Sequence, residues 1–136
     1  MSEPEIEAKA ILEVKDKLSN VVPTPPDQQP VSNPEALKKR LEWGEPGLTI
    51  ADARDRDSFN NERIVGAVPI DSPETLERLM NSLSTSREIY IYGDTDAQAQ
   101  EAIDKFVSAG FESVSLLQGG LDAWKAISGS TEGRIS

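Results

Sequence analysis

The sequence contains no cysteine and no histidine. Without cysteine, a chain forms no disulfide and offers no thiolate nucleophile, and without both residue types it lacks the usual ligands of zinc. Without histidine, no imidazole is present to act as an acid or base near neutral pH. Any catalysis by this chain must therefore use Asp, Glu, Lys, Arg, Ser, Thr or Tyr side chains. We expect neither a cofactor nor a metal site.

Long apolar runs and positive charge are also scarce. No run approaches the roughly 18 apolar residues of a membrane span, and the acidic start of the chain lacks the basic and apolar regions of a signal peptide. The sequence has 14 Lys and Arg against 24 Asp and Glu, a net charge of −10. Such a surface repels nucleic-acid phosphates and anionic lipid. We therefore expect a cytoplasmic protein that binds no nucleic acid and is not inserted in a membrane.

Proline is unevenly placed and marks a boundary. The segment VVPTPPDQQP, residues 21–30, contains four prolines, which favour extended backbone and exclude a helix or a central strand. Before it, apolar residues recur every four positions from Ile6 to Leu18, which predicts a short amphipathic helix. We expect residues 1–30 to form this helix and a linker, residues 31–130 to form one domain, and residues 131–136 to form a tail.

From residue 31 on, helix and strand patterns alternate. A capping residue before proline starts two of the helices, with Asn33 or Ser32 before Pro34 and Ser72 before Pro73. Short apolar runs predict buried strands. This alternation indicates an α/β fold, a parallel sheet of about four to five strands flanked by helices on both faces. The predicted helical segments are 32–44, 72–83, 94–110 and 121–127, and the predicted strand segments are 48–54, 66–70, 88–93 and 113–120.

The turn after the strand at residues 88–93 is the expected place for a site. In parallel sheets of this kind, ligands bind outside the carboxyl ends of the strands, near the helix N-termini. Backbone N–H groups converge there and the helix dipole adds positive potential, so the turn suits an anion. Two carboxylates, Asp94 and Asp96, lie in this turn.

Two segments of the chain resemble the signatures of the rhodanese-like domain family. The segment IADARDRDSFNNERIVGAVPI is similar to the first signature, and SAGFESVSLLQGGLDAWKA resembles the second. Over residues 32–129 the resemblance implies a rhodanese-like fold. The matching positions are Asp52, Arg54, Asp55, Phe59, Ile64, Gly66 and Ala67 in the first segment, and Ala109, Gly110, Phe111, Val114, Leu117, Gly119, Gly120 and Trp124 in the second.

The chain departs from the family where the family does its chemistry. The resemblance implies a loop of the form Cys-x-x-Gly-x-Arg after the third strand, but Gly93 stands at the cysteine position, Asp96 at the glycine and Gln98 at the arginine. In the first signature, Glu62 replaces a usual glycine and Arg63 a usual histidine. A sulfurtransferase needs a thiolate to carry sulfur, so we expect no sulfur transfer. The degenerate active-site loop consists of Gly93, Asp94, Thr95, Asp96, Ala97 and Gln98.

The residue types suggest structural roles for the remaining candidates. We expect Asp94 and Asp96 to cap the following helix and to occupy the anion position themselves, which is worth about 1 kcal/mol. Arg63 is a candidate ion-pair partner for one of them. Trp43 and Trp124 are expected to anchor core or helix packing. Asp52 and Arg54 are expected to fix the backbone at the carboxyl end of the sheet, with Asp55, Arg56 and Asp57 largely solvated.

Three hypotheses for function follow from different classes. The first is a catalytically inactive rhodanese-like module that binds an unidentified protein partner, through the face around residues 93–98 or through the N-terminal helix. The second is a Mg²⁺-dependent phosphatase or phosphotransferase, because the turn superficially resembles the Asp-x-Asp loop of haloacid dehalogenase-like enzymes, with Asp94 as nucleophile and Asp96 as acid. The third is a cation or small-ligand sensor at the same turn.

Overall fold

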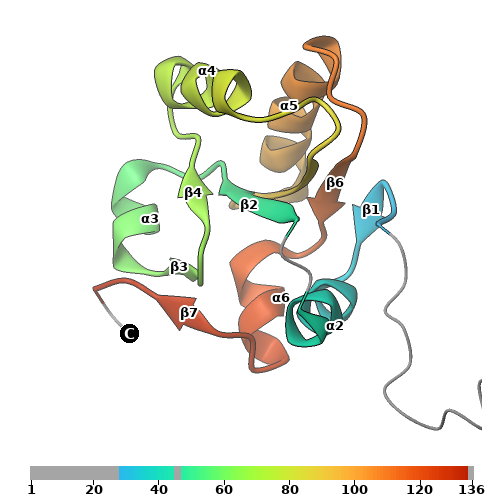
Figure 1. Ribbon diagram of the computed structural model, residues 1–136. Coiled ribbons are helices and arrows are strands. Elements are labelled where there is room, and N and C mark those ends of the chain that lie inside the picture. The colour runs from blue at the N-terminus through green and yellow to red at the C-terminus, as the bar shows by residue number, and fades with distance from the viewer. Residues whose placement is uncertain (1–27, 45–46, 135–136) are drawn as a thin grey trace, which may run out of the picture.

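The computed structural model describes residues 28–44 and 47–134 (Figure 1). The predicted N-terminal helix and most of the proline-rich linker lie outside these residues. A five-stranded parallel sheet with strand order β1-β6-β5-β2-β4 forms the centre of the domain. The α/β class and the number of strands are therefore as predicted. The strands are β1 (Val31–Ser32), β2 (Leu48–Asp52), β4 (Val68–Pro69), β5 (Glu88–Tyr92) and β6 (Val114–Leu117).

Helices cover both faces of the sheet, with α4 and α5 above it and α2 and α6 below it in Figure 1. Helices α2, α4 and α5 each return the chain to the amino end of the sheet, because a parallel neighbour needs a crossover connection. Each helix of the described residues follows a strand of this sheet, so its N-terminus lies at the carboxyl edge. The helices are α2 (Pro34–Trp43), α3 (Arg56–Asn61), α4 (Pro73–Ser82), α5 (Asp96–Ser108) and α6 (Gly120–Ala126).

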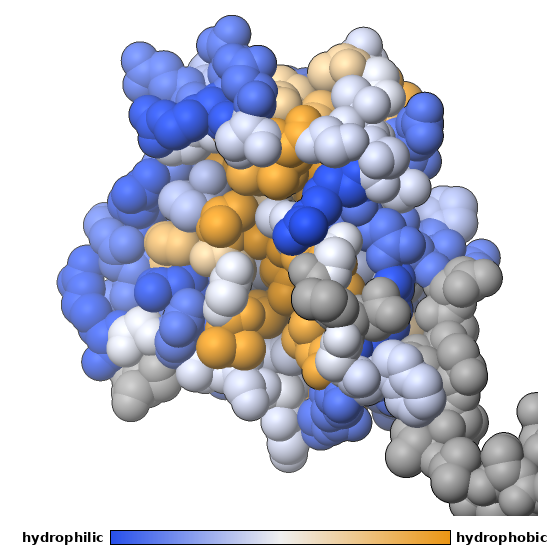
Figure 2. Space-filling model, in the orientation of Figure 1, coloured by the Kyte–Doolittle hydropathy of each residue, from blue (hydrophilic) through white to orange (hydrophobic). Residues whose placement is uncertain are grey.

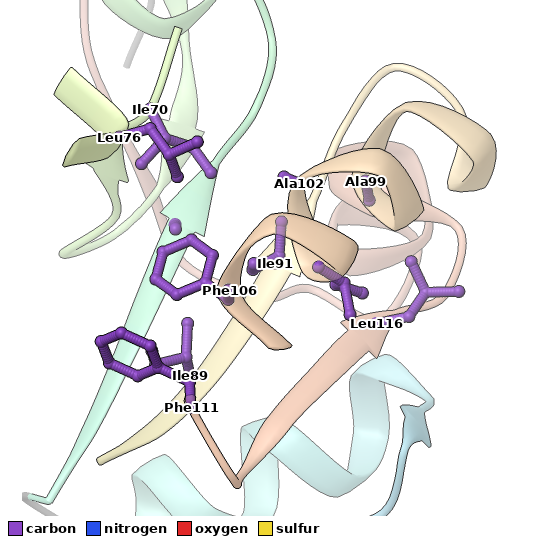
Figure 3. Close-up of a cluster of buried hydrophobic side chains, with 11 residues drawn as sticks. Ile70, Leu76, Ile89, Ile91, Ala99, Ala102, Phe106, Phe111 and Leu116 are labelled. Carbon is purple, nitrogen blue, oxygen red and sulfur yellow. The ribbon is translucent and has the colours of Figure 1, made fainter. Parts of the chain in front are cut away.

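The core is divided by the sheet into two apolar clusters. Under α4 and α5, the side chains of Ile89 and Ile91 meet those of Phe106 and Phe111 (Figure 3), whose rings lie 5.1 Å apart edge to face. On the other face of the sheet, Trp124 of α6 packs against Tyr90 and Tyr92, which alternate with Ile89 and Ile91 along β5. Residues of α2 and α3 belong to the same cluster. Strand β5 is thus buried on both sides, which explains why its sequence reads as a continuous apolar run.

Helix starts follow the local sequence as expected. The side chain of Asn33 accepts a hydrogen bond from the backbone N–H of Ala36 at 2.8 Å and caps α2. Ser72 caps α4 in a reciprocal arrangement with Thr75. Helix α2 ends at Gly44, whose φ of 94° lies in the left-handed region that glycine adopts without strain.

A second, two-stranded sheet joins the end of the chain to the domain. Strand β3 (Arg63–Ile64) pairs antiparallel with β7 (Thr131–Glu132). The segment assigned to a C-terminal tail therefore begins with a strand. Such two-residue strands have no apolar alternation that a pattern could reveal.

Among the helices of the described residues, none has the length and apolar character that a membrane crossing requires.

Candidate functional site

Two turns meet at the carboxyl edge of the sheet. Strands β2 and β5 are parallel neighbours, with Asp52 opposite Tyr92 in the register. The β2–α3 turn (residues 52–55) and the β5–α5 loop (residues 93–98) therefore leave the sheet side by side. This is also where the connections from the sheet diverge to opposite sides, the place where such folds hold their ligands.

The β2–α3 turn is built on a buried ion pair. Asp52 is fully buried and accepts hydrogen bonds from the backbone N–H of Arg54 at 2.9 Å and from its guanidinium at 2.7 Å. The same guanidinium donates to the carbonyl of Glu62 at 2.6 Å. These bonds join the end of β2 to the far end of α3. Asp52 and Arg54 thus fix the backbone as expected, and Asp55, Arg56 and Asp57 are exposed.

Tyr92 extends this network across the sheet. Its hydroxyl donates to Asp52 Oδ2 at 2.6 Å and accepts from the backbone N–H of Ile64 at 3.1 Å. Burial, together with the neighbouring Asp52 carboxylate, raises the pKa of the Tyr92 phenol well above its usual range. The phenol therefore stays protonated at physiological pH and remains a hydrogen-bond donor to the carboxylate.

The β5–α5 loop uses its own side chains to bind its own backbone. Thr95 Oγ1 accepts from the N–H of Gln98 at 3.1 Å, and Gln98 Oε1 accepts from the N–H of Asp94 at 2.6 Å. Asp96 Oδ1 accepts from the N–H of Gly119 at 3.1 Å, which joins the loop to the start of α6. These three N–H groups, which an anion at this edge could otherwise use, already have oxygen partners.

Gly93 is buried and closely surrounded. A Cβ atom added there would lie 2.6 Å from Gln98 Oε1 and 3.2 Å from the backbone nitrogen of Ala99. On the other side, a Cβ at Gly120 would lie 2.7 Å from the carbonyl oxygen of Gly93. A side chain at position 93 could enter only if the Gln98 side chain moved. A side chain at position 93 would thus compete with the end of the Gln98 side chain, which now accepts the N–H of Asp94.

The predicted role of the two loop carboxylates needs correction. The residue that caps α5 is Thr95, because its hydroxyl reaches the N–H of Gln98. Asp96 binds Gly119 instead, and the Asp94 side chain is exposed and bonds to no described residue. The spacing of Thr95 and Gln98 matches the Thr-x-x-Gln pattern of a capping box, although Gln98 accepts the N–H of Asp94 rather than that of the cap residue Thr95. That pattern was the signal in the sequence that could have revealed the role of Gln98.

Two further predictions were wrong. Arg63 does not pair with the loop: its guanidinium bonds to Glu132 at 3.3 Å and lies over the ring of Phe59 at 4.5 Å, because β3 runs beside β7. Trp43 does not anchor the core but is 45% exposed, since the inward face of α2 is taken by Leu37 and Arg40. Trp124 is buried as expected.

The other signature residues lie in the folded domain. Phe59, Ala67 and Trp124 belong to the apolar cluster on the face of α2 and α6. The glycines at positions 66, 110 and 119 all have φ near 90°, at 82°, 96° and 82°. At these turns a side chain would be strained, which accounts for glycine there without any role in binding.

A pocket opens between α4 and α5 at the same edge of the sheet. It has a volume of about 190 Å³, and Ala53, Ile70, Leu76 and Ala102 form its apolar surface. Asp71, Glu101, Lys105 and Gln98 contribute polar groups. This α4–α5 pocket shares Gln98 with the β5–α5 loop. No feature of the sequence indicated it, because its walls come from three separate segments.

Carboxylates of the described residues form no metal site. Within 28–44 and 47–134, no three Asp or Glu side chains come together as ligands for a metal ion.

Comparison with known proteins identifies relatives of this chain. The family model of the rhodanese-like domain matches residues 33–127. The thiosulfate sulfurtransferase GlpE of Coxiella burnetii is 30% identical over 92 residues, which span 68% of this chain and 79% of that protein. The centrosomal protein of 41 kDa of Homo sapiens is 33% identical over 106 residues, 70% of this chain and 28% of that protein.

Solved structures are similar over the same region. The crystal structure of the Alr3790 protein from Anabaena sp. has 50% identity and a TM-score of 0.72, and the alignment covers 77% of this chain and 94% of that one. The solution structure of the rhodanese-like domain of the same protein has 50% identity and a TM-score of 0.74, over 79% of this chain and 82% of that one.

Proposed function

This chain belongs to the rhodanese-like domain family, and we propose that it is a member that transfers no sulfur and acts by binding a protein partner. One observation carries the proposal: the sequence has no cysteine, and the position at which the family resemblance places the nucleophile is Gly93, beside which the Gln98 side chain fills the space. A sulfur carrier must be a thiolate, because neither a hydroxyl nor a carboxylate forms a persulfide.

The surface around the loop supports a role in binding. Residues 94–97 are all exposed, whereas Gly93 beneath them is buried. The side chains of Thr95, Asp96 and Gln98 brace the loop with hydrogen bonds to the chain's own backbone. A surface that is ordered before binding loses less conformational entropy when a partner docks.

The phosphatase hypothesis and the cation-sensor hypothesis gain no such support. Asp96, the acid of the phosphatase hypothesis, is already bonded to Gly119. Asp94 is an exposed carboxylate near the Arg54 guanidinium, and no group of three acidic ligands is found among the described residues. Both hypotheses stay predictions.

Two measurements test the proposal. Thiocyanate formation from thiosulfate and cyanide should not rise above the uncatalysed rate with this chain, and should stay there with Gly93→Cys, since Gln98 fills the space and no loop arginine is present. The relative from Coxiella burnetii is the positive control. Thiocyanate production by the unmodified chain would overturn the proposal.

Affinity capture from a lysate of the source organism tests the binding role. The whole chain is compared with Asp94→Lys/Ala97→Lys, which changes two exposed side chains of the loop and none of its internal hydrogen bonds. We expect a stoichiometric partner that the unmodified chain retains and the variant loses. If both chains retain the same partner, the loop is not its binding surface; if neither retains one, the binding role fails.

A further inference from the structure

The α4–α5 pocket has the size of a single side chain. At about 190 Å³ it is smaller than the roughly 300 Å³ at which pockets for small-molecule ligands begin. Its base is apolar, with Ile70, Leu76 and Ala102 almost fully buried. Small pockets of this kind at protein interfaces receive one anchoring residue, commonly Trp, Tyr or Arg. The volume therefore favours a side chain of a partner over a free metabolite.

The charge at this edge of the sheet favours a cation. Each α-helix of the described residues has an acidic residue in its first turn, and all these first turns lie at the carboxyl edge. These residues are Glu35, Asp57, Glu74, Asp96 and Asp122. Arg56 is an exposed cation there, and Asp71 holds it at 3.0 Å. The resulting potential attracts a basic segment and repels an acidic one.

The polar groups that line the pocket also favour a cation. Glu101 is exposed and pairs with no described residue, and it lies beside the apolar base. Lys105, the cation of the pocket, lies nine residues beyond Asp96, which places it roughly 13 Å down the axis of α5 from the edge. Asp71, Gln98 and Glu101 therefore lie nearer to the carboxyl edge than Lys105 does.

We propose that the α4–α5 pocket is the docking site for one arginine side chain of a basic segment in the partner protein. The aliphatic stem of arginine can cover Ile70, Leu76 and Ala102, and its planar guanidinium can donate to Glu101. Asp71 offers only Oδ2 as a second acceptor, because its Oδ1 already accepts from Arg56 and Thr75. An acidic side chain would face the carboxylate of Glu101, and a purely apolar one would leave Glu101 desolvated without a partner. The inference rests on the proposed binding function and adds the chemistry of the partner.

Occupation of this pocket is coupled to the loop through Gln98. Its side chain lines the pocket, and its Oε1 accepts the N–H of Asp94. An arginine seated in the pocket therefore changes the surroundings of that hydrogen bond. The amide signal of Asp94 should respond even though the residue does not touch the ligand.

The test is a titration of the isotope-labelled whole chain with N-acetyl-arginine methylamide, followed by amide NMR. We expect saturable shifts at Ala53, Gln98, Ala102 and Asp94 with a roughly millimolar dissociation constant. N-acetyl-glutamate methylamide, the probe of opposite charge, should give none.

Two exposed glutamates provide matched variants. Glu101→Lys should weaken binding of the arginine probe at least tenfold, whereas Glu112→Lys changes the net charge equally and should leave it within twofold. Shifts that do not saturate, or equal weakening by both variants, would mean general attraction to an acidic surface and overturn the inference. If the arginine probe fails while loop-dependent capture persists and no thiocyanate forms, only this inference falls.

Discussion

The turns after β2 and β5 lie next to each other at one edge of the sheet, yet their charged residues are used in opposite ways. In the β2–α3 turn, Asp52 and Arg54 are buried and bound to each other, to Tyr92 and to the end of α3. In the β5–α5 loop, Asp94 and Asp96 are exposed, and the hydrogen bonds are caps within the loop and one bond to α6.

At this edge of the sheet, the β2–α3 turn contributes to stability, whereas the β5–α5 loop is free to vary with function. A buried charge that loses its partner remains desolvated, so the β2–α3 turn tolerates little change. Exposed residues around a helix cap can be exchanged at small cost, which leaves the β5–α5 loop open to loss of a nucleophile without loss of the fold. The relatives of this chain include a thiosulfate sulfurtransferase. We therefore expect the β5–α5 loop, rather than the β2–α3 turn, to differ between catalytic and non-catalytic members of the family.

The largest expected effect is that of Asp52→Asn. The variant keeps the volume but removes the charge that pairs with buried Arg54, so the free energy of unfolding should fall by about 3–5 kcal/mol. Asp94→Asn, the matched change in the loop, should alter it by no more than about 0.5 kcal/mol. Urea denaturation of both variants measures the contrast, and similar losses in both would contradict it.

Tyr92→Phe should have an intermediate effect. It removes the hydroxyl that joins Asp52 to the N–H of Ile64, and one such buried hydrogen-bonding group contributes about 1–2 kcal/mol. If the hydroxyl acts through Asp52, the loss should shrink when Tyr92→Phe is made in the Asp52→Asn background. Strict additivity in this double-mutant cycle would argue against a shared network.

Thr95→Ala should destabilise the chain by about 1 kcal/mol, since the cap of α5 is lost. Thr95→Ser keeps the oxygen and should restore most of the stability. Hydrogen exchange at the first turn of α5 reports the effect locally. A chain in which alanine and serine behave alike would show that the hydroxyl is not the cap.

The smallest effect concerns the contribution of Asp71, which directly precedes the cap of α4, to stability at acidic pH. The hydrogen bond from Arg56 lowers the pKa of Asp71 in the folded chain. A carboxyl whose pKa is lowered by folding adds stability above its unfolded pKa of about 3.9, and this contribution is lost as the pH falls through the lower folded value. Asp71→Asn should therefore destabilise the chain at pH 7 by at most about 1 kcal/mol. The difference from the unmodified chain should shrink as the pH falls below the unfolded pKa and through the lower folded value.

Much of the fold could be predicted because burial on both faces leaves a clear pattern. The apolar runs at residues 48–52 and 88–92 and the proline-led helix starts at Pro34 and Pro73 appear in the structure where the sequence places them. Strands β1, β3 and β7 have two residues each, too few for any periodicity, and they depend on contacts distant in the sequence.

The site was harder to predict than the fold. Acidic residues near a helix start suggested caps, but a hydroxyl at Thr95 had the better position, and a carboxylate at Asp96 reached Gly119, 23 residues away in the sequence. The exposure of Trp43 followed from the orientation of α2, which its sequence alone does not determine. The α4–α5 pocket arises only from the packing of two helices.

A thiosulfate titration followed by amide NMR tests the central claim most directly. The claim is that the N–H groups of Asp94, Gln98 and Gly119 at this edge already donate to the chain's own oxygens, so these three groups bind no substrate anion. We predict that the amide signals of Asp94, Gln98 and Gly119 stay unmoved at thiosulfate concentrations that saturate a catalytic relative. Saturable shifts confined to these three amides would show an open anion site and contradict the account.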